Sequence, residues 1–449
     1  MLTRIEIDGF KSFRDFEVEL LPFQVILGAN SAGKSNFFDA LQFLSRLADS
    51  DLATAMRGMR GEPEELFSHG PGGVASRMQF GLDLLLDLSV RDPWGVDKQL
   101  TNTRVRYELT LARRDVGGIE RLFVTNETAK PILKRADRWV SDAAVPKTFR
   151  DSYVRRTQRG PFLETTTEDD RPVFSISQDG HQGRKRPAHA AESTILSGIT
   201  NTEFAHLFAL REELRAWRFL QLNPEALRQP SPQLSPDTLT HDGSNLAAVL
   251  ARLRSETAEA ERPEGILADV SLALTHLVPD VRRLDVVEDR ERKEYRIDVT
   301  MQDGQRFPSR VLSDGTLRIL ALLTLMHDPK NRGLLCFEEP ENGVHPFRLG
   351  QLIETLRNLT TDVTDGEPDE TEPLRQVLMN SHSPVVLNNL QDTEALFADA
   401  VTRVEGGEIT RATRIRPVSS SLLPTDPGHV SGELVRRYLE AAAPTETQA

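Results

Sequence analysis

Cysteine and a surplus of positive charge are what this sequence most clearly lacks. One cysteine, Cys336, occurs among 449 residues, so no disulfide bond can form within the chain. Such sparing use of cysteine favours a reducing compartment. The 55 lysine and arginine residues are outnumbered by 68 aspartate and glutamate residues, which gives a net charge of −13. This balance excludes a surface covered in nucleic-acid-binding charge, although a local basic groove is compatible with it.

Long apolar runs are missing as well. No stretch approaches the roughly 18 consecutive apolar residues that a membrane helix needs. The first residues, MLTRIEIDGFKSF, alternate like a strand and include acidic residues, unlike the apolar core of a signal peptide. We therefore expect a cytoplasmic protein that makes no membrane contact. The content of 38% hydrophobic and 27% charged residues is that of an ordinary globular protein.

Apolar periodicity gives a coarse map of the chain. Residues 2–27 contain three short segments typical of strands, and residues 36–48 carry apolar side chains at helical spacing. Residues 77–90 and 103–114 are typical of an antiparallel sheet. Further elements are predicted downstream: helices over 203–217 and 244–261, and a hairpin that turns at Asp303-Gly304.

The stretch 131–190 is polar and has few apolar runs. It carries 12 basic and 8 acidic residues in a chain that is otherwise acidic, and its most basic piece is Arg184-Lys185-Arg186. A solvated, partly mobile insertion accounts for this composition. A contact surface for a nucleic-acid backbone or an acidic partner is the alternative.

Residues 28–35, GANSAGKS, match the phosphate-loop pattern G-x-x-x-x-G-K-[ST]. An apolar strand precedes the match and a helix follows it, which is the context that distinguishes a true phosphate loop from a chance glycine-rich turn. Small residues let backbone N–H groups form an anion nest, to which the helix N-terminus adds its dipole. Lys34 would bridge the β- and γ-phosphates of ATP, and Ser35 would ligate Mg²⁺. The predicted ATP contacts are Gly28, Ala29, Asn30, Ser31, Ala32, Gly33, Lys34, Ser35 and Asn36.

Two adjacent carboxylates, Glu338 and Glu339, follow directly on the apolar run 334–337. Repulsion and desolvation both oppose such a pair at the end of a buried strand, unless a positive group lies beside it. A phosphate loop needs a second strand end that brings carboxylates to its metal ion. We therefore expect Glu338 to hold Mg²⁺ and Glu339 to act as the general base toward water. A solvated turn after a core strand is the alternative.

Four motifs, in their order along the chain, resemble those of the ABC-type ATPase heads of the SMC/RecF/OLD group, above all its compact RecF-like members. The phosphate loop and the segment EEPENGVHP are the specific ones. Residues 311–316, VLSDGT, resemble the ABC signature loop, and residues 380–384, NSHSP, resemble the switch-histidine loop. The N-terminal FKSF at 10–13 resembles the first strand-turn of these heads.

The resemblance implies an α/β fold of the ABC-type ATPase head. This is a P-loop NTPase with a mixed central sheet, an antiparallel N-terminal β-subdomain and a helical or irregular insertion lobe. We expect the N-terminal part of the head over 1–130, an insertion lobe over 131–300, the C-terminal part over 301–440 and a disordered tail over 441–449. One departure concerns Glu338, because most heads of the group carry aspartate there. The signature also departs from the usual LSGGQ, at Asp314 and Thr316.

The signature further implies a partner. In ABC-type heads it reaches the nucleotide of the opposite subunit, so Ser313 and Gly315 would contact ATP across a head-to-tail homodimer that encloses two nucleotides. A plain helix cap is the alternative for Ser313. His382 would contact the γ-phosphate and take part in catalysis with Glu339 and Lys34. A loop histidine satisfied by its own neighbours is the alternative for His382.

Four more residues are candidates for the site. Lys11 lies in the FKSF turn, and Asn342 and His345 would lie at the dimer seam. His345 and Pro346 could instead simply start the next helix. Gln79 is the candidate for a Q-loop, with an ordinary strand residue as the alternative.

Two functions from different classes remain. The interval between Ser35 and Leu312 holds strands, prolines and short helices in place of a coiled coil, and no carboxylate cluster of a fused nuclease follows His382. This favours an ATP-driven switch that gates a separate effector protein in antiphage defence or a stress response. The alternative is a RecF-like repair or recombination ATPase that clamps DNA between paired heads. An ABC transporter ATPase fits less well, because the signature is divergent.

Overall fold

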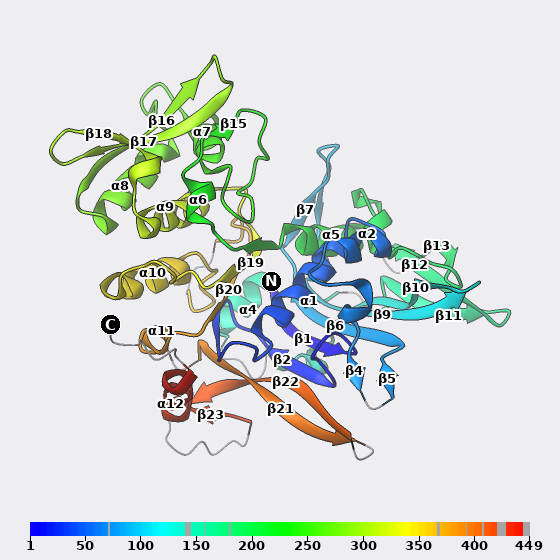
Figure 1. The fold of residues 1–449 in the computed structure, drawn as a ribbon. Coiled ribbons are helices and arrows are strands. Elements are labelled where there is room, and N and C mark those ends of the chain that lie inside the picture. Colours follow the sequence, from blue (N-terminus) through cyan, green and yellow to red (C-terminus); the bar gives the residue numbers. More distant parts are fainter. Residues whose placement is uncertain are drawn as a thin grey trace.

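The computed structural model describes residues 1–70, 72–139, 145–157, 159–178, 181–365, 369–391, 393–405, 408–419 and 428–442. Two large β-sheets pack around helix α1 (Lys34–Leu47), and a lobe of helices and short strands stands beside them (Figure 1). The predicted α/β fold, with a mixed central sheet and an antiparallel N-terminal sheet, is confirmed.

The antiparallel sheet has eight strands in the order β13-β12-β11-β10-β9-β6-β1-β2. In chain order they are β1 (Leu2–Asp8), β2 (Phe16–Glu19), β6 (Arg77–Leu85), β9 (Arg104–Val116), β10 (Ile119–Pro131), β11 (Leu163–Glu168), β12 (Arg171–Gln178) and β13 (His181–Pro187). The division of the chain into domains stays a prediction, but the sheet runs through its boundary at residue 130.

Strands β11 to β13 correct the interpretation of 131–190 as an irregular insertion. They lengthen the antiparallel sheet, and β13 is its edge strand. Their polar composition has a physical reason, since Phe174 and Ile176 are buried against the core while much of the rest faces water. On β13, Arg184 pairs with Glu203 at 2.8 Å and Lys185 pairs with Glu168. These two charges are thus partly satisfied within the chain.

The mixed sheet has the order β14-β19-β20-β3-β21-β22-β23. Its strands are β3 (Phe23–Leu27), β14 (Arg218–Leu220), β19 (Gly333–Glu338), β20 (Arg375–Ser381), β21 (Ala395–Glu405), β22 (Glu408–Ser419) and β23 (Val430–Ser431). The first five in spatial order are parallel, and β22 runs antiparallel to β21. Parallel pairing brings the carboxyl ends of β3, β20 and β19 to one edge, where ligands bind in such sheets.

Helix α1 forms the core between the sheets. Its apolar side chains at helical spacing are buried, as predicted from residues 36–48. The centroid of the Phe43 ring lies 5.9 Å from that of Phe10 and 6.1 Å from that of Phe80. One helix residue thus contacts both the turn after β1 and strand β6. Burying an aromatic side chain of this kind stabilises the fold by about 2–3 kcal/mol. The helix that follows the phosphate loop is thereby held firmly in place.

The lobe comprises residues 224–327 and appears in green and yellow-green in Figure 1. It contains a small antiparallel sheet in addition to helices, and it overlaps only part of the insertion lobe that we predict over 131–300. Its elements are α6 (Pro224–Leu227), β15 (Ser231–Pro232), α7 (Leu246–Thr257), α8 (Ile266–Leu277), β16 (Val281–Asp289), β17 (Glu294–Met301), β18 (Arg306–Pro308) and α9 (Asp314–His327). The predicted hairpin at Asp303-Gly304 is present between β17 and β18.

Several shorter elements join these units. They are α2 (Leu52–Arg57), α4 (Lys147–Tyr153), α5 (Ala205–Ala216), α10 (Pro346–Asn358), α11 (Pro384–Leu387), α12 (Gly432–Ala442) and the β7–β8 hairpin (Ser89–Arg91 and Asp97–Gln99). Helix α12 includes residues 441 and 442, which we had assigned to a disordered tail, and 443–449 lie outside the described residues. None of the helices in the described ranges is long and apolar enough to span a bilayer.

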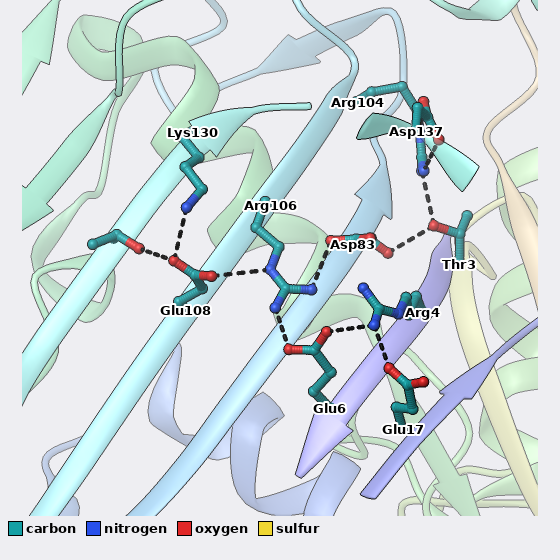
Figure 2. A network of polar contacts seen from close by, with 11 residues as sticks. Thr3, Arg4, Glu6, Glu17, Asp83, Arg104, Arg106, Glu108, Lys130 and Asp137 are labelled. Carbon is teal, nitrogen blue, oxygen red and sulfur yellow. Dashed lines mark hydrogen bonds and ion pairs between the residues drawn. The ribbon is translucent and has the colours of Figure 1, made fainter. Parts of the chain in front are cut away.

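A network of ion pairs covers the outer face of the antiparallel sheet, opposite α1 (Figure 2). Arg106 on β9 is its centre and pairs with Glu6, Asp83 at 3.0 Å and Glu108 at 3.2 Å. Lys130 reaches the same Glu108 at 3.0 Å. Arg4 pairs with Glu6 at 2.8 Å and also with Glu17, so basic and acidic side chains alternate over this face. The face is therefore polar, in contrast to the apolar face that packs on α1.

Candidate functional site

The phosphate loop spans the gap between the end of β3 and the start of α1. Gly33 has φ 94° and precedes the helix without a side-chain cap, and α1 has no acidic residue in its first turn. A Cβ atom on Gly33 would lie 1.9 Å from Thr413 Oγ1, and one on Gly28 would lie 2.6 Å from the carbonyl oxygen of Ala398. Strands β21 and β22 thus press on the loop, and only glycine fits at these positions. The uncapped helix end is suited to an anion.

Lys34 is buried, with 6% of its surface exposed, and folds back over the loop. Its Nζ donates to the carbonyl oxygens of Gly28 at 2.6 Å and Ala29 at 2.9 Å. Burial lowers the pKa of Lys34, while the nearby carboxylates of Glu339, Glu341 and Glu338 act in the opposite direction. The loop lysine therefore lies within the field of the carboxylates that follow β19, as the sequence predicted for Lys34 and the glutamate pair.

The strand register explains this proximity. Glu338 at the end of β19 pairs with Asn380 on β20, and Asn380 pairs with Ile26 on β3. Burial raises the pKa of Glu338, and Asp39 and Glu339 raise it further, whereas Arg60 and Lys34 lower it. Glu338 is therefore a partly buried carboxylate whose charge is opposed mainly by desolvation.

Asp39 and Arg60 are site residues that sequence reasoning missed. Arg60 donates to Asp39 at 2.9 Å and to the Ser35 carbonyl at 3.3 Å, and it lies 3.7 Å from Glu338 Oε1. Lys11 pairs with the same Asp39 at 2.6 Å, which places it beside the predicted metal residues. The available signal for Asp39 was its spacing of four residues, one helical turn, from Ser35. Arg60 carried no comparable signal.

These oxygens suit Mg²⁺ in kind. The Ser35 backbone carbonyl and the Glu338 carboxylate both lie near the Arg60 guanidinium, which places the two residues close together. The Ser35 hydroxyl and the Glu338 carboxylate are oxygen ligands of the kind that Mg²⁺ prefers. No group of three or more histidine, cysteine, aspartate or glutamate side chains in the described chain could hold a metal ion by itself.

Glu339 lies at the centre of a second group of contacts. Its Oε2 accepts from Asn342 Nδ2 at 2.8 Å, and its Oε1 lies 3.0 Å from Nδ1 of His382. Its backbone N–H donates to Asn380 Oδ1 at 3.0 Å, and its φ of 45° lies in the left-handed region. The structure thus brings together Glu339, Asn342 and His382, all of them predicted, at the ends of β19 and β20.

Glu341 is another residue that sequence reasoning missed. It is buried, with 8% of its surface exposed, and it accepts a hydrogen bond from the Ser381 hydroxyl. Burial raises the pKa of Glu341. Its position two residues after Glu339 was visible in the sequence, but nothing there distinguished it from a surface glutamate.

Ser313 caps helix α9 and accepts from the Thr316 N–H at 3.2 Å. No hydrogen bond among the described residues joins Ser313 to the phosphate loop of its own chain. A Cβ on Gly315 would lie 3.0 Å from the Gly343 carbonyl oxygen, so the signature turn packs on the turn after Glu339. The helix-cap alternative for Ser313 is therefore realised, and a role in ATP contact stays a prediction.

His345 and Gln79 lie apart from this group. His345 caps helix α10, accepting from the Phe347 N–H at 3.4 Å, as the alternative for this residue predicted. Its ring stacks on the exposed Phe347 ring at 5.4 Å. Gln79 lines the outer face of the antiparallel sheet, while its neighbours Met78 and Phe80 are buried on the α1 side. Among the described residues no hydrogen bond connects Gln79 to the phosphate loop. The alternative, an ordinary strand residue, therefore fits Gln79 better than a Q-loop.

The chain is similar in sequence or fold to several known proteins. The chain is 26% identical over 280 residues to the "DNA replication and repair protein RecF" of Acidothermus cellulolyticus (strain ATCC 43068 / DSM 8971 / 11B), covering 59% of this chain and 71% of that protein. Among solved structures it is similar to an SMC head bound to the C-terminal winged-helix domain of ScpA, with a TM-score of 0.45, 12% identity and coverage of 93% and 97%. An SMC head domain from Pyrococcus yayanosii gives a TM-score of 0.42, 12% identity and coverage of 98% and 99%.

A family model extends this result over most of the sequence. The model described as "AAA domain, putative AbiEii toxin, Type IV TA system" matches residues 23–388, from strand β3 through helix α11. The match includes the phosphate loop, the paired glutamates and the switch-histidine loop. The chain therefore belongs to this family of AAA-type ATPases.

Proposed function

We propose that the chain binds ATP with Mg²⁺ between its phosphate loop and the ends of β19 and β20, and that it hydrolyses ATP as a molecular switch. The observation that carries this proposal is the convergence of Lys34, Glu339 and His382 from three separate elements. A loop that binds anions, a candidate general base and a candidate γ-phosphate contact are the parts that phosphoryl transfer to water requires.

Each side chain has a definite task in this scheme. The amides of the loop and Lys34 bind the phosphates, for which Lys34 exchanges its two carbonyl contacts. Ser35 and Glu338 would hold Mg²⁺, which neutralises phosphate charge when bound. Glu339 would act as the general base toward water: Asn342 and His382 each engage one of its oxygens, and its side chain remains 33% exposed. Each oxygen keeps a further lone pair that can accept from water.

A head-to-tail homodimer completes the site. Ser313 and the N-terminus of α9 make no hydrogen bond to the phosphate loop within the described chain, although a helix N-terminus is suited to phosphate. We assign this end of α9 to the nucleotide of a second copy. ATP would then join two chains, and loss of the γ-phosphate would release them.

The switch gates a separate effector protein in antiphage defence or a stress response. The compact lobe over 224–327 and the family description, which refers to a toxin–antitoxin system, both support this role.

A RecF-like DNA clamp is the second candidate, and the RecF relative favours it. The outer face of the antiparallel sheet argues against DNA at that surface. A polar hollow of about 570 Å³ lies there, and its acidic lining residues are Glu6, Asp8, Asp15, Glu17 and Glu108. These charges repel phosphate, and the central Arg106 is already paired (Figure 2).

Phosphate release in the presence of ATP and Mg²⁺, with and without duplex DNA, tests both candidates. The switch predicts turnover that DNA leaves unchanged and that EDTA abolishes. Strong stimulation by DNA that falls steeply with salt would establish the clamp instead. Failure of the purified chain to take up ATP would refute the proposal as a whole.

A further inference from the structure

Glu341 ties together the two loops that carry the predicted catalytic residues. It follows Glu339 by two positions on the turn after β19, and it contacts Ser381 at the end of β20. Ser381 Oγ accepts a hydrogen bond from the Ser383 N–H at 3.0 Å, so its own proton is directed to Glu341 Oε1. This pair of bonds fixes the turn that presents His382. A buried carboxylate therefore determines where that histidine lies.

The second oxygen of Glu341 has no partner. Glu341 Oε2 is buried without a hydrogen bond among the described residues, and so is Arg318 Nε on helix α9. Arg318 NH1 donates to the Glu339 carbonyl oxygen at 3.3 Å, and the electrostatic field of Glu341 acts on Arg318. Buried donors and acceptors are rarely left unpaired, because each loses its hydrogen bonds to water and gains none in return. Arg318 contacts the Glu339 carbonyl, and Glu341 lies two residues further along the chain. Two unpaired groups of opposite charge this close to Glu339 indicate an interaction that forms in another state.

Arg318 provides the link to the signature. It lies little more than one turn into α9, the helix that Ser313 caps, and the same helix end packs on the turn after Glu339 through Gly315. A small shift of α9 would move the guanidinium relative to both Glu339 and Glu341. The helix that we assign to the second nucleotide is thus connected to the catalytic turn of its own chain.

We infer that Glu341 is a positioning residue for hydrolysis. Through Arg318 it responds to the position of helix α9, and through Ser381 it fixes the position of His382. The inference rests on the proposed function. In this arrangement Glu341 acts through its contact with Ser381. Its loss slows turnover by misplacing His382, while ATP binding at the phosphate loop is preserved.

Three substitutions separate this role from simple structural support. Glu341→Gln keeps the shape and the acceptor for Ser381 but removes the charge that faces Arg318. Ser381→Ala keeps the charge but removes the hydroxyl, and Arg318→Gln removes the guanidinium. The control is Glu394→Gln, which removes another buried carboxylate, paired with Arg357 at 2.6 Å at the far end of the mixed sheet. The control reports what the loss of a buried ion pair does to the melting temperature alone.

We expect kcat for ATP hydrolysis to fall about 10- to 100-fold in each of the three variants. The Kd for ATP, measured by fluorescence of a nucleotide analogue, should stay within about threefold of wild type, because the substitutions leave the contacts between the phosphate loop and ATP unchanged. The double variants that join Glu341→Gln with Ser381→Ala or with Arg318→Gln should be about as slow as the slower single variant, as residues of one chain of contacts behave. Glu394→Gln should lower the melting temperature and leave kcat unchanged.

Two results would overturn the inference while leaving the ATPase intact. One is an active wild type with Glu341→Gln turning over at the same rate. The other is fully additive losses in the double variants, which would show that the residues act separately. Absence of ATP binding to the wild type would remove the proposed function and this inference together.

Discussion

Replacing Glu339 with glutamine removes the carboxylate that faces water and leaves the shape of the side chain unchanged. The amide oxygen still accepts from Asn342, which lies 2.8 Å away, and the amide nitrogen takes the place of the oxygen beside His382. The loop residues and Lys34 are untouched, so ATP binding should survive. Loss of a general base lowers a rate by about 10²- to 10⁴-fold, or about 3–5 kcal/mol in activation free energy.

The assay combines turnover with mass. With ATP and Mg²⁺, the Glu339→Gln chain should hydrolyse at the reduced rate and accumulate as a dimer. Light scattering should then report about twice the monomer mass of 50.3 kDa with ATP but not with ADP. Glu354→Gln on the exposed face of α10 is the matched control and should behave as wild type. Normal turnover by a Glu339→Gln chain that remains monomeric would refute both the base and the dimer.

The remaining predictions concern binding and stability. Lys34→Ala should abolish nucleotide uptake in a fluorescence titration, because Lys34 is the buried cation that contacts the loop carbonyls of Gly28 and Ala29; retained affinity would contradict the assigned phosphate contact. Phe43→Ala should lower the free energy of unfolding by about 3–5 kcal/mol in urea titrations, and a loss below about 1 kcal/mol would show that the site collapses around the gap. Burial raises the pKa of Glu127 from 4.5 to about 7. The folded state then holds an extra proton, so stability should fall by about 3 kcal/mol between pH 4.5 and 7, and Glu127→Gln should flatten that decline; an identical decline in the variant would assign it to other groups.

Local patterns made the phosphate loop and the paired glutamates predictable. Both depend on residues that are neighbours in the sequence, flanked by a strand and a helix whose periodicity is plain. His382 was predictable through its loop, since NSHSP follows an apolar strand. The gathering of these three motifs also followed from a general rule, because parallel strands place their carboxyl ends at one edge.

Contacts between distant segments were beyond such patterns. Asp39 and Arg60 meet only because the segment after α2 folds back over α1, and Glu341 is buried only because Ser381 lies opposite it. The reason for glycine at position 33 was also incomplete, since Thr413 on β22 approaches it from 380 residues away. Strands β11 to β13 were missed because a sheet exposed on one face needs few apolar residues.

The positive φ of Glu339 means that stability and catalysis favour different residues at this position. A non-glycine residue in this conformation costs about 1–3 kcal/mol. Glycine or asparagine at position 339 would relieve that cost, so a screen for heat resistance should enrich them. Such variants would be more stable but would lack the proposed general base. A selection for thermal stability in this protein therefore has to be combined with a selection for ATP turnover.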